Sequence, residues 1–431
     1  MTINLKNFLS DKSKLSKMGE FQDLKPLDGL EVSSISADLY NNGRDDLALF
    51  YFKEGANYAT LSTTNSIVSE TITWNEKSNK KIIKALLVNT KNANTFTGKQ
   101  GYEAIDTVAK SLAKDLTLRE SKKEEGISET IKIKDLIFAS TGVIGETFPG
   151  EQIANRINDL VSKLRDDQNK LIWIKTASAI MTTDTKPKLA YEEFTFNNKI
   201  IRIAAIAKGS GMIAPNMATM LAFIFTNAQF EKKLFKKRFY DIVDRTFNSS
   251  TVDGDTSTSD MALFVSVNTS SKKLANSKES KSFFYSLEKV MTLLSDYIIR
   301  DGEGASKFIK IHINGAKNQT DAKNVGKSIA NSPLFKTAMA GSDANWGRII
   351  MAIGKSNAKI IPSKLSIRFG KYELLRKGEK LISINLKSID KYLTNREIQI
   401  SVDLGIGNSS WAIKTCDFTN KYISINTDYR S

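Results

Sequence analysis

The stretch AKGSGMIAPNMATMLAFIF, residues 207–225, joins two strand-like segments through a glycine-containing loop. Apolar residues dominate segments 200–206 and 220–226 around that loop, as expected of buried strands. Thr219 opens the second strand. A threonine at such a junction suits an N-terminal nucleophile, whose hydroxyl is activated by its own α-amino group once the preceding peptide bond is cut. Because threonine is common at strand starts, a purely structural role is the alternative interpretation.

Strand and helix patterns alternate along the rest of the chain. The expected strands are Leu47–Phe52, Lys81–Val88, Ile133–Ala139, Ile200–Ile206, Met220–Thr226, Met261–Val267, Phe308–Ile313 and Glu397–Leu404. The expected helices, with apolar residues three and four positions apart, are Tyr102–Leu116, Glu151–Leu164, Lys232–Phe247, Ser282–Ile299 and Ser328–Ala338. Polar surface loops are expected over Ser121–Glu129 and Ser270–Lys281. The sequence therefore predicts a mixed α and β (α+β) fold, and no linker marks a domain boundary.

Length and composition are those of a globular protein. The chain has 431 residues, 41% of them hydrophobic and 26% charged, which excludes wholesale disorder and a fibrous fold. The longest apolar run, Met220–Phe225, is far shorter than the roughly 20 residues that cross a bilayer, so we expect no membrane span. The first residues lack the apolar stretch of a secretory signal, and the expected location is the cytoplasm.

Histidine and cysteine are scarce, with one residue of each. His312 and Cys416 cannot build a zinc site of the usual Cys/His kind, and no metal is predicted. His312 lies in an alternating strand pattern, which favours a structural or exposed histidine over a catalytic one. Cys416 has no partner for an intramolecular disulfide and is predicted to be a small buried residue. Any catalysis is expected to use hydroxyls, carboxylates, lysines or a backbone amine.

The formal net charge of +16 is uneven, with +3 on residues 1–218 and +13 on residues 219–431. Such an excess raises the hypothesis of nucleic-acid binding. The lysines of the second half are dispersed, however, and lack the aromatic or arginine-rich patterns of nucleic-acid modules. We therefore predict a solvated, lysine-rich surface and no nucleic-acid partner. Attraction of anionic substrates would need no dedicated patch.

Three motif matches are rejected. Gly209–Ala214 matches the dinucleotide fingerprint, but Pro215 falls where the following helix should be established. Gly326–Ser328 looks like the end of a phosphate loop, yet Asp321 occupies the required upstream glycine position. The run TVDGDTSTSD at 251–260 lacks the glycine and glutamate that a calcium-binding loop needs. No resident cofactor is predicted.

Four clusters remain in which hydroxyl side chains accompany residues that orient small polar ligands. They are STGVIG at 140–145, MTTDTKPK at 181–188, the stretch at 207–225 and TVDGDTSTSD at 251–260. Glycine lets backbone N–H groups approach an oxyanion closely, so such clusters suit a ligand site. For each cluster alone, a turn satisfied by its own side chains is the alternative.

These clusters resemble the ornithine acetyltransferase family of arginine biosynthesis, also described as bifunctional glutamate N-acetyltransferases and amino-acid acetyltransferases. Further matching segments extend the resemblance over nearly the whole chain: DDLALF at 45–50, the asparagine-rich segment 89–98, DGEGASKF at 301–308, GSDANWGRI at 341–349 and INTDYRS at 425–431. The resemblance implies N-terminal-nucleophile-like layered sheets flanked by helices.

The resemblance also implies self-cleavage at the Ala218–Thr219 bond. The products would be an α chain of residues 1–218 and a β chain of residues 219–431, expected to assemble as α2β2. Thr219 would be the nucleophile of both self-cleavage and acetyl transfer, and its freed α-amine would be the general base.

The family's reaction moves the acetyl group of N-acetylornithine to glutamate, with release of ornithine, through an acetyl-threonine in a ping-pong sequence. By the motif match, Thr141 and Gly142 would form the oxyanion hole. Lys208 would meet a substrate carboxylate, and Glu303 the cationic amine of ornithine. The substrate-binding positions carried over by the match are Thr182 or Thr183, Lys208, Thr219, Glu303, Asn426 and Ser431.

Three questions stay open at this stage. The sequence does not distinguish Thr182 from Thr183 as the substrate contact, and it does not decide whether acetyl-CoA is a second acetyl donor. A related N-terminal-nucleophile amidohydrolase or an acetyltransferase of secondary metabolism is the alternative function. The chain also departs from the family pattern at Lys91 and Thr415, where glycine is usual, and at Phe96, where a small residue is usual. These departures are expected to alter local turns.

Overall fold

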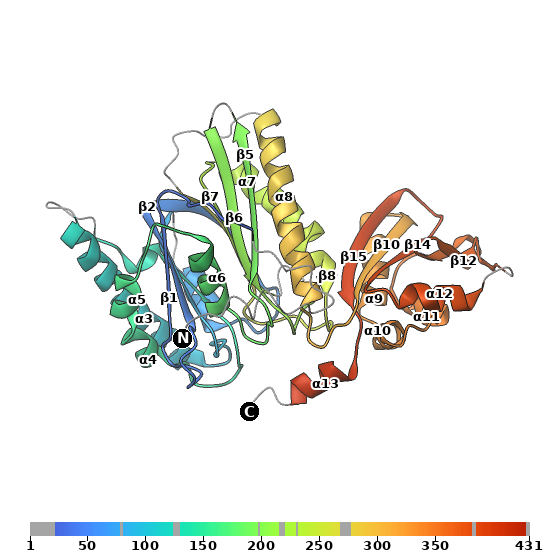
Figure 1. Cartoon of the computed structure of the whole chain (residues 1–431), viewed down its shortest axis with the longest axis horizontal. Helices are drawn as coiled ribbons and strands as arrows, with labels where there is room; N and C mark the ends of the chain where they lie inside the picture. Colours follow the sequence, from blue (N-terminus) through green and yellow to red (C-terminus); the bar gives the residue numbers. More distant parts are fainter. Residues whose placement is uncertain are drawn as a thin grey trace.

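Two β-sheets with helices packed against them form a mixed α/β architecture (Figure 1). The sheets lie side by side along the long axis of the molecule, and this arrangement confirms the predicted class. The computed structural model describes residues 22–77, 81–123, 130–196, 199–214, 220–229, 232–267, 277–381 and 385–427.

The first sheet has eight strands in the order β4-β3-β2-β9-β7-β6-β5, with β1 paired to β2 beside this path. Its strands are β1 (Leu30–Ile35), β2 (Leu47–Ser62), β3 (Ile83–Asn89), β4 (Leu136–Ser140), β5 (Lys188–Phe196), β6 (Lys199–Lys208), β7 (Leu221–Thr226) and β9 (Met261–Val267). β7 runs parallel to β9 and antiparallel to β6.

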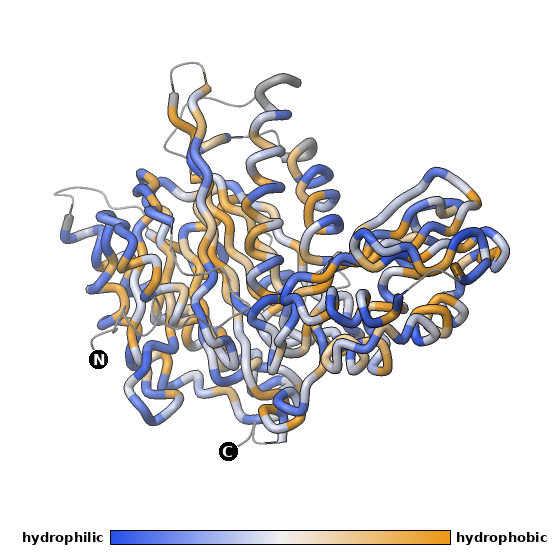
Figure 2. Tube along the Cα trace, turned by 45° about the vertical axis from the view of Figure 1, so that its right-hand side comes forward, coloured by the Kyte–Doolittle hydropathy of each residue, from blue (hydrophilic) through white to orange (hydrophobic). Residues whose placement is uncertain are grey.

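The long strand β2 lets this sheet fold over on itself. Residues 47–52 pair with β1, whereas residues 56–62 pair with β9. Gly55, between these two parts, has a positive φ of 74° that only glycine adopts at low cost. Aromatic side chains from the two halves meet face to face, since the rings of Phe50 and Phe225 stack with centroids 4.8 Å apart. The two halves thus enclose one apolar core, visible as the orange interior of Figure 2.

Helices cover the outer faces of the two halves. The helices of this region are α2 (Glu70–Lys77), α3 (Gly98–Lys123), α4 (Gly150–Ala154), α5 (Ile157–Ser162), α6 (Lys170–Ala179), α7 (Lys232–Arg245) and α8 (Ser277–Arg300). α3, α4 and α5 share a buried cluster with β2, β3 and β4. α7 and α8 share another with β6, β7 and β9. Two helical layers and two sheet layers result, and α6 packs against the core between the two halves of the sheet.

The second sheet has seven strands in the order β13-β12-β11-β14-β10-β15-β8. They are β8 (Ser250–Thr251), β10 (Phe308–Ala316), β11 (Ser366–Phe369), β12 (Tyr372–Arg376), β13 (Glu379–Lys380), β14 (Glu397–Asp403) and β15 (Ser409–Cys416). The helices of this region are α9 (Gln319–Ala330), α10 (Pro333–Ala340), α11 (Trp346–Gly354), α12 (Leu386–Leu393) and α13 (Asn420–Thr427). Ile309, Ile311 and Ile313 of β10 form a core with α9 to α12.

All eight predicted strands exist, but two predicted helices are broken. The segment Ser328–Ala338 spans α9 and α10, because Ser332 caps a new helix whose first residue is Pro333, which has no N–H to continue the old one. Glu151–Leu164 divides into α4 and α5 where the Arg156 N–H bonds Ile153 rather than the residue four back. The predicted loop Ser270–Lys281 is partly wrong, since α8 begins at Ser277.

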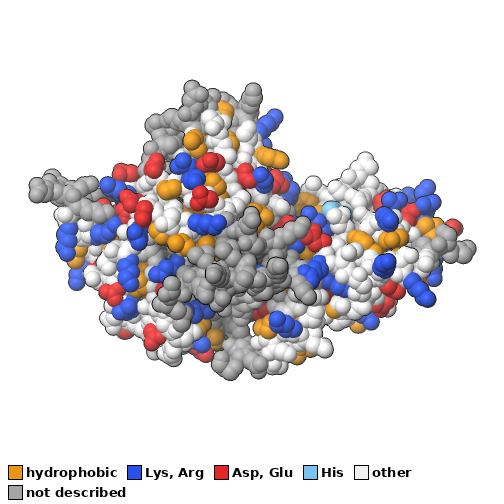
Figure 3. Space-filling model, in the orientation of Figure 1, with side chains coloured by type: hydrophobic (Ala, Val, Ile, Leu, Met, Phe, Trp, Pro, Cys, Tyr) orange, Lys and Arg blue, Asp and Glu red, His pale blue; other side chains and the backbone are white. Residues whose placement is uncertain are grey.

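The predictions for Cys416 and His312 agree with the structure. The prediction that the excess lysines form a solvated surface needs correction. Cys416 is fully buried, and burial raises its pKa to about 11. His312 lies half-buried on β10, where burial and then Lys310 lower its pKa. On the face shown in Figure 3, Lys and Arg side chains are interspersed with Asp and Glu. Three lysines of the second half, Lys307, Lys336 and Lys414, are nevertheless buried, so the excess charge is only partly solvated surface.

The predicted chain boundary falls within the first sheet. β6 ends at Lys208 and β7 begins at Leu221, and these two strands are hydrogen-bonded neighbours. Ala218 and Thr219 lie outside the described residues. The predicted division into residues 1–218 and 219–431 therefore does not coincide with the division into two sheets, because β7 and β9 belong to the first sheet.

Candidate active site

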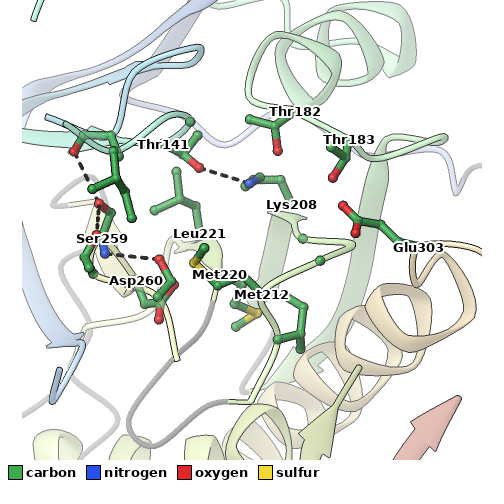
Figure 4. Close-up of a pocket in the computed structure, with 18 of the residues that line it drawn as sticks. Thr141, Thr182, Thr183, Lys208, Met212, Met220, Leu221, Ser259, Asp260 and Glu303 are labelled. Carbon is green, nitrogen blue, oxygen red and sulfur yellow. Dashed lines mark hydrogen bonds between the residues drawn. The ribbon is translucent and has the colours of Figure 1, made fainter. Parts of the chain in front are cut away.

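One pocket gathers the described residues that the family match singled out (Figure 4). It opens where β6 ends and where β7 and β9 begin, and loops after β4, before β5 and after α8 complete it. The predicted site residues that line it are Thr141, Gly142, Thr182, Thr183, Lys208, Glu303 and Asn426. Met220, the first described residue after the predicted cleavage bond, also lines it. Thr219, Ala218 and Ser431 lie outside the described residues.

The loop that holds Thr141 and Gly142 leaves β4 in a backbone shape that requires glycine. Gly142 has a φ of 137°, and a Cβ there would lie 2.1 Å from the carbonyl carbon of Lys91. The asparagine-rich segment fixes this loop, since the Asn92 amide donates to the carbonyls of Glu146 and Thr147 at 3.2 and 3.1 Å. Two neighbouring donors, a hydroxyl and a backbone N–H, are thus held at the pocket wall.

Lys208 reaches the same point from the end of β6. Its Nζ donates to Thr141 Oγ1 at 3.0 Å, and its side chain is buried. Because an ammonium group only donates, the Thr141 hydroxyl must accept this bond, and its own proton is left for a second acceptor. The contact therefore leaves the Thr141 hydroxyl proton available to an acceptor in the pocket. Burial lowers the pKa of Lys208, although Asp184 partly opposes this effect.

The opposite side of the pocket carries Glu303 and Asn426. The Asn426 amide donates to Glu303 Oε2 at 2.7 Å, so α13 orients the carboxylate that follows α8. Glu303 also passes so close to Gly211 that a Cβ on that glycine would lie 2.4 Å from the carboxylate. Only glycine at position 211 leaves the carboxylate in place. Glu303 and Lys208 thus present opposite charges to one small pocket, as a zwitterionic ligand requires.

A buried ion triplet lies behind the pocket, and sequence reasoning missed it. Lys188 Nζ lies 2.6 Å from Asp184 Oδ1 and 2.6 Å from Asp301 Oδ2, and its side chain is fully buried. Burial lowers the pKa of Lys188, but the two carboxylates outweigh it and the pKa is raised. Burial likewise raises the pKa of Asp184, but Lys188 and Lys208 outweigh it and the pKa is lowered. Lys188 and Asp184 are therefore both charged at neutral pH.

The triplet ties three loops of the pocket together. Asp184 accepts the Thr182 N–H at 3.1 Å and the Gly209 N–H at 2.6 Å. The Asp301 carbonyl accepts the Ser210 hydroxyl at 2.6 Å, and the Ser210 carbonyl accepts the Glu303 N–H at 3.0 Å. The relative positions of Thr182, Lys208 and Glu303 therefore depend on one lysine. Its sequence signal was a Lys and an Asp four residues apart in MTTDTKPK, which does not distinguish a buried pair from a surface one.

The motif rejected as a calcium loop has a structural role instead. Asp253 accepts the N–H groups of Met212 at 2.6 Å and of Ile213 at 2.9 Å. Thr256 Oγ1 donates to the Ala214 carbonyl at 3.1 Å. Met212 has a φ of 55°, which is costly for a side chain of its size. These contacts anchor the chain just before the predicted cleavage bond.

The three departures from the family pattern have local explanations. Lys91 has a φ of 71° and Phe96 a φ of 60°, a region where glycine is the preferred residue. Phe96 is 77% exposed and therefore collides with nothing. Thr415 Oγ1 accepts a bond of 2.7 Å from the buried Lys336 Nζ, so this side chain satisfies a cation that glycine would leave without that contact. Lys91 and Phe96 thus adopt a backbone conformation that suits glycine, and the expectation of altered local turns stays a prediction.

Across the described ranges, no group of three or more His, Cys, Asp or Glu side chains is placed to hold a metal ion. In the same part of the chain, none of the helices has the length and apolar character needed to cross a bilayer.

Comparisons with known proteins agree with the sequence resemblance. A family model described as the ArgJ family matches residues 31–431. The arginine biosynthesis bifunctional protein ArgJ of Caulobacter vibrioides is 38% identical over 418 residues, covering 95% of this chain and 100% of that protein. The ArgJ protein of Ruegeria pomeroyi is 40% identical over 419 residues, covering 95% and 97%. A crystal structure of the Bacillus halodurans ArgJ protein is 35% identical, has a TM-score of 0.46 and covers 48% of this chain and 97% of that one.

The family model extends from residue 31 to residue 431, and both curated relatives exceed 30% identity over nearly their whole length. The sequence resemblance is thereby confirmed, and the chain is an enzyme of the ArgJ family.

Proposed function

We propose that this enzyme transfers the acetyl group of N-acetylornithine to glutamate, and that it does so after cutting itself between Ala218 and Thr219. The observation that carries the proposal is a pocket beside Met220 that combines the Thr141–Gly142 loop, a buried lysine and a carboxylate. The names of the curated relatives, which place them in arginine biosynthesis, support the same substrates.

The proposed catalytic sequence is a ping-pong exchange at one hydroxyl. Thr219 Oγ would attack the acetyl carbonyl while its proton passes to the α-amine of the same residue. Thr141 and Gly142 would stabilise the oxyanion of the tetrahedral intermediate. The C–N bond of the acetamide would then break, the proton would pass to the departing ornithine nitrogen, and glutamate would later take the acetyl group from the threonine ester.

Substrate recognition would follow the charges of the pocket. Ornithine carries a carboxylate and a cationic side-chain amine, and Lys208 and Glu303 offer one partner for each. Thr182 and Thr183 both line the pocket, which supports either of them as a further contact. Asn426 would act through Glu303, since its amide is already bonded to that carboxylate.

Self-cleavage would leave two interleaved chains. Strands β7 and β9, which follow residue 219, lie between β6 and β2, which precede it. The two products would therefore share one sheet and stay associated. Association into α2β2, by analogy with the family, extends this proposal to a pair of such units.

Processing is tested on a denaturing gel of purified protein. We expect two bands. N-terminal sequencing should find Thr219 as the first residue of the second chain. Thr219→Ala should leave one inactive band, whereas Thr107→Ala, a change on the exposed face of α3, should process normally. Active protein that consists of one intact chain would refute the proposal.

Activity is tested with N-acetylornithine in the presence and absence of glutamate. Transfer of the acetyl group to glutamate supports the proposal, and hydrolysis without transfer supports the amidohydrolase alternative. A parallel assay with acetyl-CoA and glutamate decides whether this chain has the second activity that the word bifunctional denotes in its relatives' names.

A further inference from the structure

The buried Lys208 contacts a hydroxyl of the pocket rather than a carboxylate. Within the described ranges, its Nζ forms one hydrogen bond, to Thr141 Oγ1 at 3.0 Å, and no ion pair. The residue is only 8% exposed, and a lysine this buried is usually paired with an acidic side chain. Because the Thr141 hydroxyl itself lines the pocket, the arrangement points to a role for the ammonium group at that hydroxyl.

The backbone on both sides holds this contact in place. Thr141 directly follows β4, and its N–H donates to the Asn89 carbonyl at 3.1 Å. Lys208 is the last residue of β6, and the next N–H along the chain, that of Gly209, donates to Asp184 at 2.6 Å. Both side chains therefore leave from anchored backbone, and Figure 4 shows the bond between them at the pocket.

The charge of Lys208 sets the direction of this hydrogen bond. A protonated ammonium group only donates, so Thr141 Oγ1 accepts and keeps its own proton for a ligand. A neutral amine has a lone pair, to which the Thr141 hydroxyl can donate by turning its proton away from the pocket. In the part of the chain that the structure describes, the Thr141 hydroxyl has no other hydrogen-bond partner. One proton on Lys208 therefore decides whether Thr141 donates into the pocket.

Four charged groups face Lys208 from the elements around it. Asp184 precedes β5, Lys188 lies on β5, Asp260 precedes β9 and Glu303 follows α8. Among the described residues, none of the three carboxylates bonds the ammonium group, and Asp260 Oδ2 has no hydrogen-bond partner at all. Burial lowers the pKa of Lys208, and Asp184 only partly opposes this effect. Lys208 therefore loses its proton at a lower pH than an exposed lysine does.

We propose that Lys208 is a positioning residue for the Thr141 hydroxyl, whose proton it directs toward the oxyanion that forms in the pocket. This inference rests on the proposed function, in which Thr141 donates to that oxyanion. It adds to the substrate contact proposed for Lys208, since an ammonium group has three donors and Thr141 occupies one. A donor held toward developing charge acts more strongly in the transition state than in the ground state. Lys208 therefore acts on kcat and not on KM alone.

The first test is the pH profile of kcat, measured at saturating substrate and expressed per processed chain. In the wild type, kcat should fall to a lower plateau on the alkaline side, where Lys208 becomes neutral. The proposed α-amine base works in its unprotonated form, so it limits kcat only on the acidic side. Thr141→Val should lack the alkaline fall, because no hydroxyl remains to turn. Lys208→Arg should also lack it, because arginine keeps its charge.

The second test is a double-mutant cycle between Lys208 and Thr141. Lys208→Met should lower kcat on the order of tenfold, less than the roughly 10²–10³ for loss of the donor itself, because the hydroxyl remains but is no longer held. In the Thr141→Val background the same substitution should lower kcat no further, because the lysine acts through the hydroxyl. Lys310→Met removes a cation from β10, outside the pocket, and should leave kcat unchanged.

The outcomes separate this inference from the proposed function. Additive falls in kcat in the double variant, or an alkaline fall that persists in Thr141→Val, would overturn the inference. A raised KM with unchanged kcat in Lys208→Met would also overturn it and leave Lys208 as a substrate contact only. In each case, two bands and acetyl transfer by the wild type would still support the proposed function.

Asp260 is the neighbouring group whose titration could be confused with that of Lys208, since burial raises the pKa of Asp260 well above its ordinary value. Asp260→Asn removes a negative charge near the ammonium group and should move the alkaline fall to lower pH without abolishing it. Abolition of the alkaline fall in Asp260→Asn would overturn the inference and assign the titration to Asp260.

A third measurement covers variants that fail to cut themselves. NMR of the uncut Thr219→Ala precursor, labelled at lysine, follows the titration of Lys208, whose signal is identified by its absence in Lys208→Arg. Adding Thr141→Val removes the acceptor of the ammonium group, so the pKa of Lys208 should fall. An unchanged pKa would overturn the pairing.

Discussion

Each of the two regions buries a lysine completely, and the two lysines are satisfied in different ways. Lys188, at the start of β5, lies between the carboxylates of Asp184 and Asp301. Lys336, on α10, donates to the Thr415 hydroxyl and the Cys416 carbonyl. Carboxylates outweigh burial and raise the pKa of Lys188, whereas burial dominates and lowers the pKa of Lys336.

This difference reflects where each region places its buried charged groups. The first region concentrates full charges at the strand ends that form the pocket. In the second region Lys336 uses neutral acceptors, and Asn426 of α13 brings its last segment to the pocket. Asp417, which follows β15, accepts the Lys307 N–H at 2.8 Å. This bond joins the turn that carries Glu303 to the segment that leads from β15 to α13.

The largest effect should come from removing the cation of the first region. Lys188→Met leaves two buried carboxylates facing each other, and we expect a loss of about 3–5 kcal/mol in the free energy of unfolding. Lys336→Met leaves only neutral acceptors, with an expected loss of about 1–3 kcal/mol. Urea denaturation on the uncut Thr219→Ala background measures both in a single chain. Equal losses would contradict the distinction between the two lysines.

The next largest effect concerns the loop of Thr141 and Gly142 in the first region, the proposed oxyanion loop. Thr141→Val removes the hydroxyl that Lys208 orients, and kcat should fall by about 10²–10³ with little change in stability. Thr141→Ser keeps the hydroxyl and should retain most of the activity. Steady-state kinetics with N-acetylornithine and glutamate measure the two variants. A valine variant as active as the serine variant would argue against Thr141 as a donor.

A pH dependence should follow from the buried Lys208. Because burial lowers its pKa, Lys208 loses its proton at a lower pH than an exposed lysine does. Affinity for a carboxylate substrate should therefore fall on the alkaline side, with KM rising by up to about tenfold per pH unit above that pKa. Lys208→Arg keeps its charge over the same range and should flatten the rise, whatever its basal rate. An identical alkaline rise in both proteins would contradict this reasoning.

Core substitutions should separate stability from activity. Ile206 of β6 and Ile311 of β10 are both fully buried, and truncation to valine should cost each sheet about 0.5–1.5 kcal/mol. Only Ile206 lies two residues before Lys208, so only Ile206→Val should also alter kcat. A change in kcat for Ile311→Val would show that the second core communicates with the pocket.

The smallest effects concern residues with positive φ. Lys91 near the oxyanion loop has a φ of 71°, and Lys377 in the turn between β12 and β13 has a φ of 46°. Replacing either with glycine should stabilise the folded state by up to about 1 kcal/mol, because the side chain is strained in this region. Thermal unfolding measures the gain. Of the two substitutions, only Lys91→Gly should change transfer kinetics, because the Lys91 carbonyl accepts the Val143 N–H at 2.9 Å.

Sequence reasoning predicted β4, β6, β7 and β9 around the pocket because each is a run of buried residues with β propensity. It also selected the side chains that meet at one pocket, through motifs that span it. It missed β1, β5, β8 and β15, and also β11, β12 and β13, which are short and partly exposed. It missed the pairing of Lys188 with Asp301 because 113 residues separate them, and no local pattern reports which distant charges the fold brings together. Asp260 was quoted within a motif, but its unpaired oxygen is a property of the packed structure.

The strand order of the first sheet has a consequence for refolding. As one chain, β2, β6, β7 and β9 find each other in a unimolecular process whose rate is independent of concentration. After a cut at residue 218, the same sheet could re-form only when two separate chains collide, each of which lacks the neighbours that cover its own strand edges. We therefore expect the uncut precursor to recover from denaturant and the processed enzyme to aggregate. Processing would make the fold kinetically trapped, a state that persists by slow unfolding and is not rebuilt once lost.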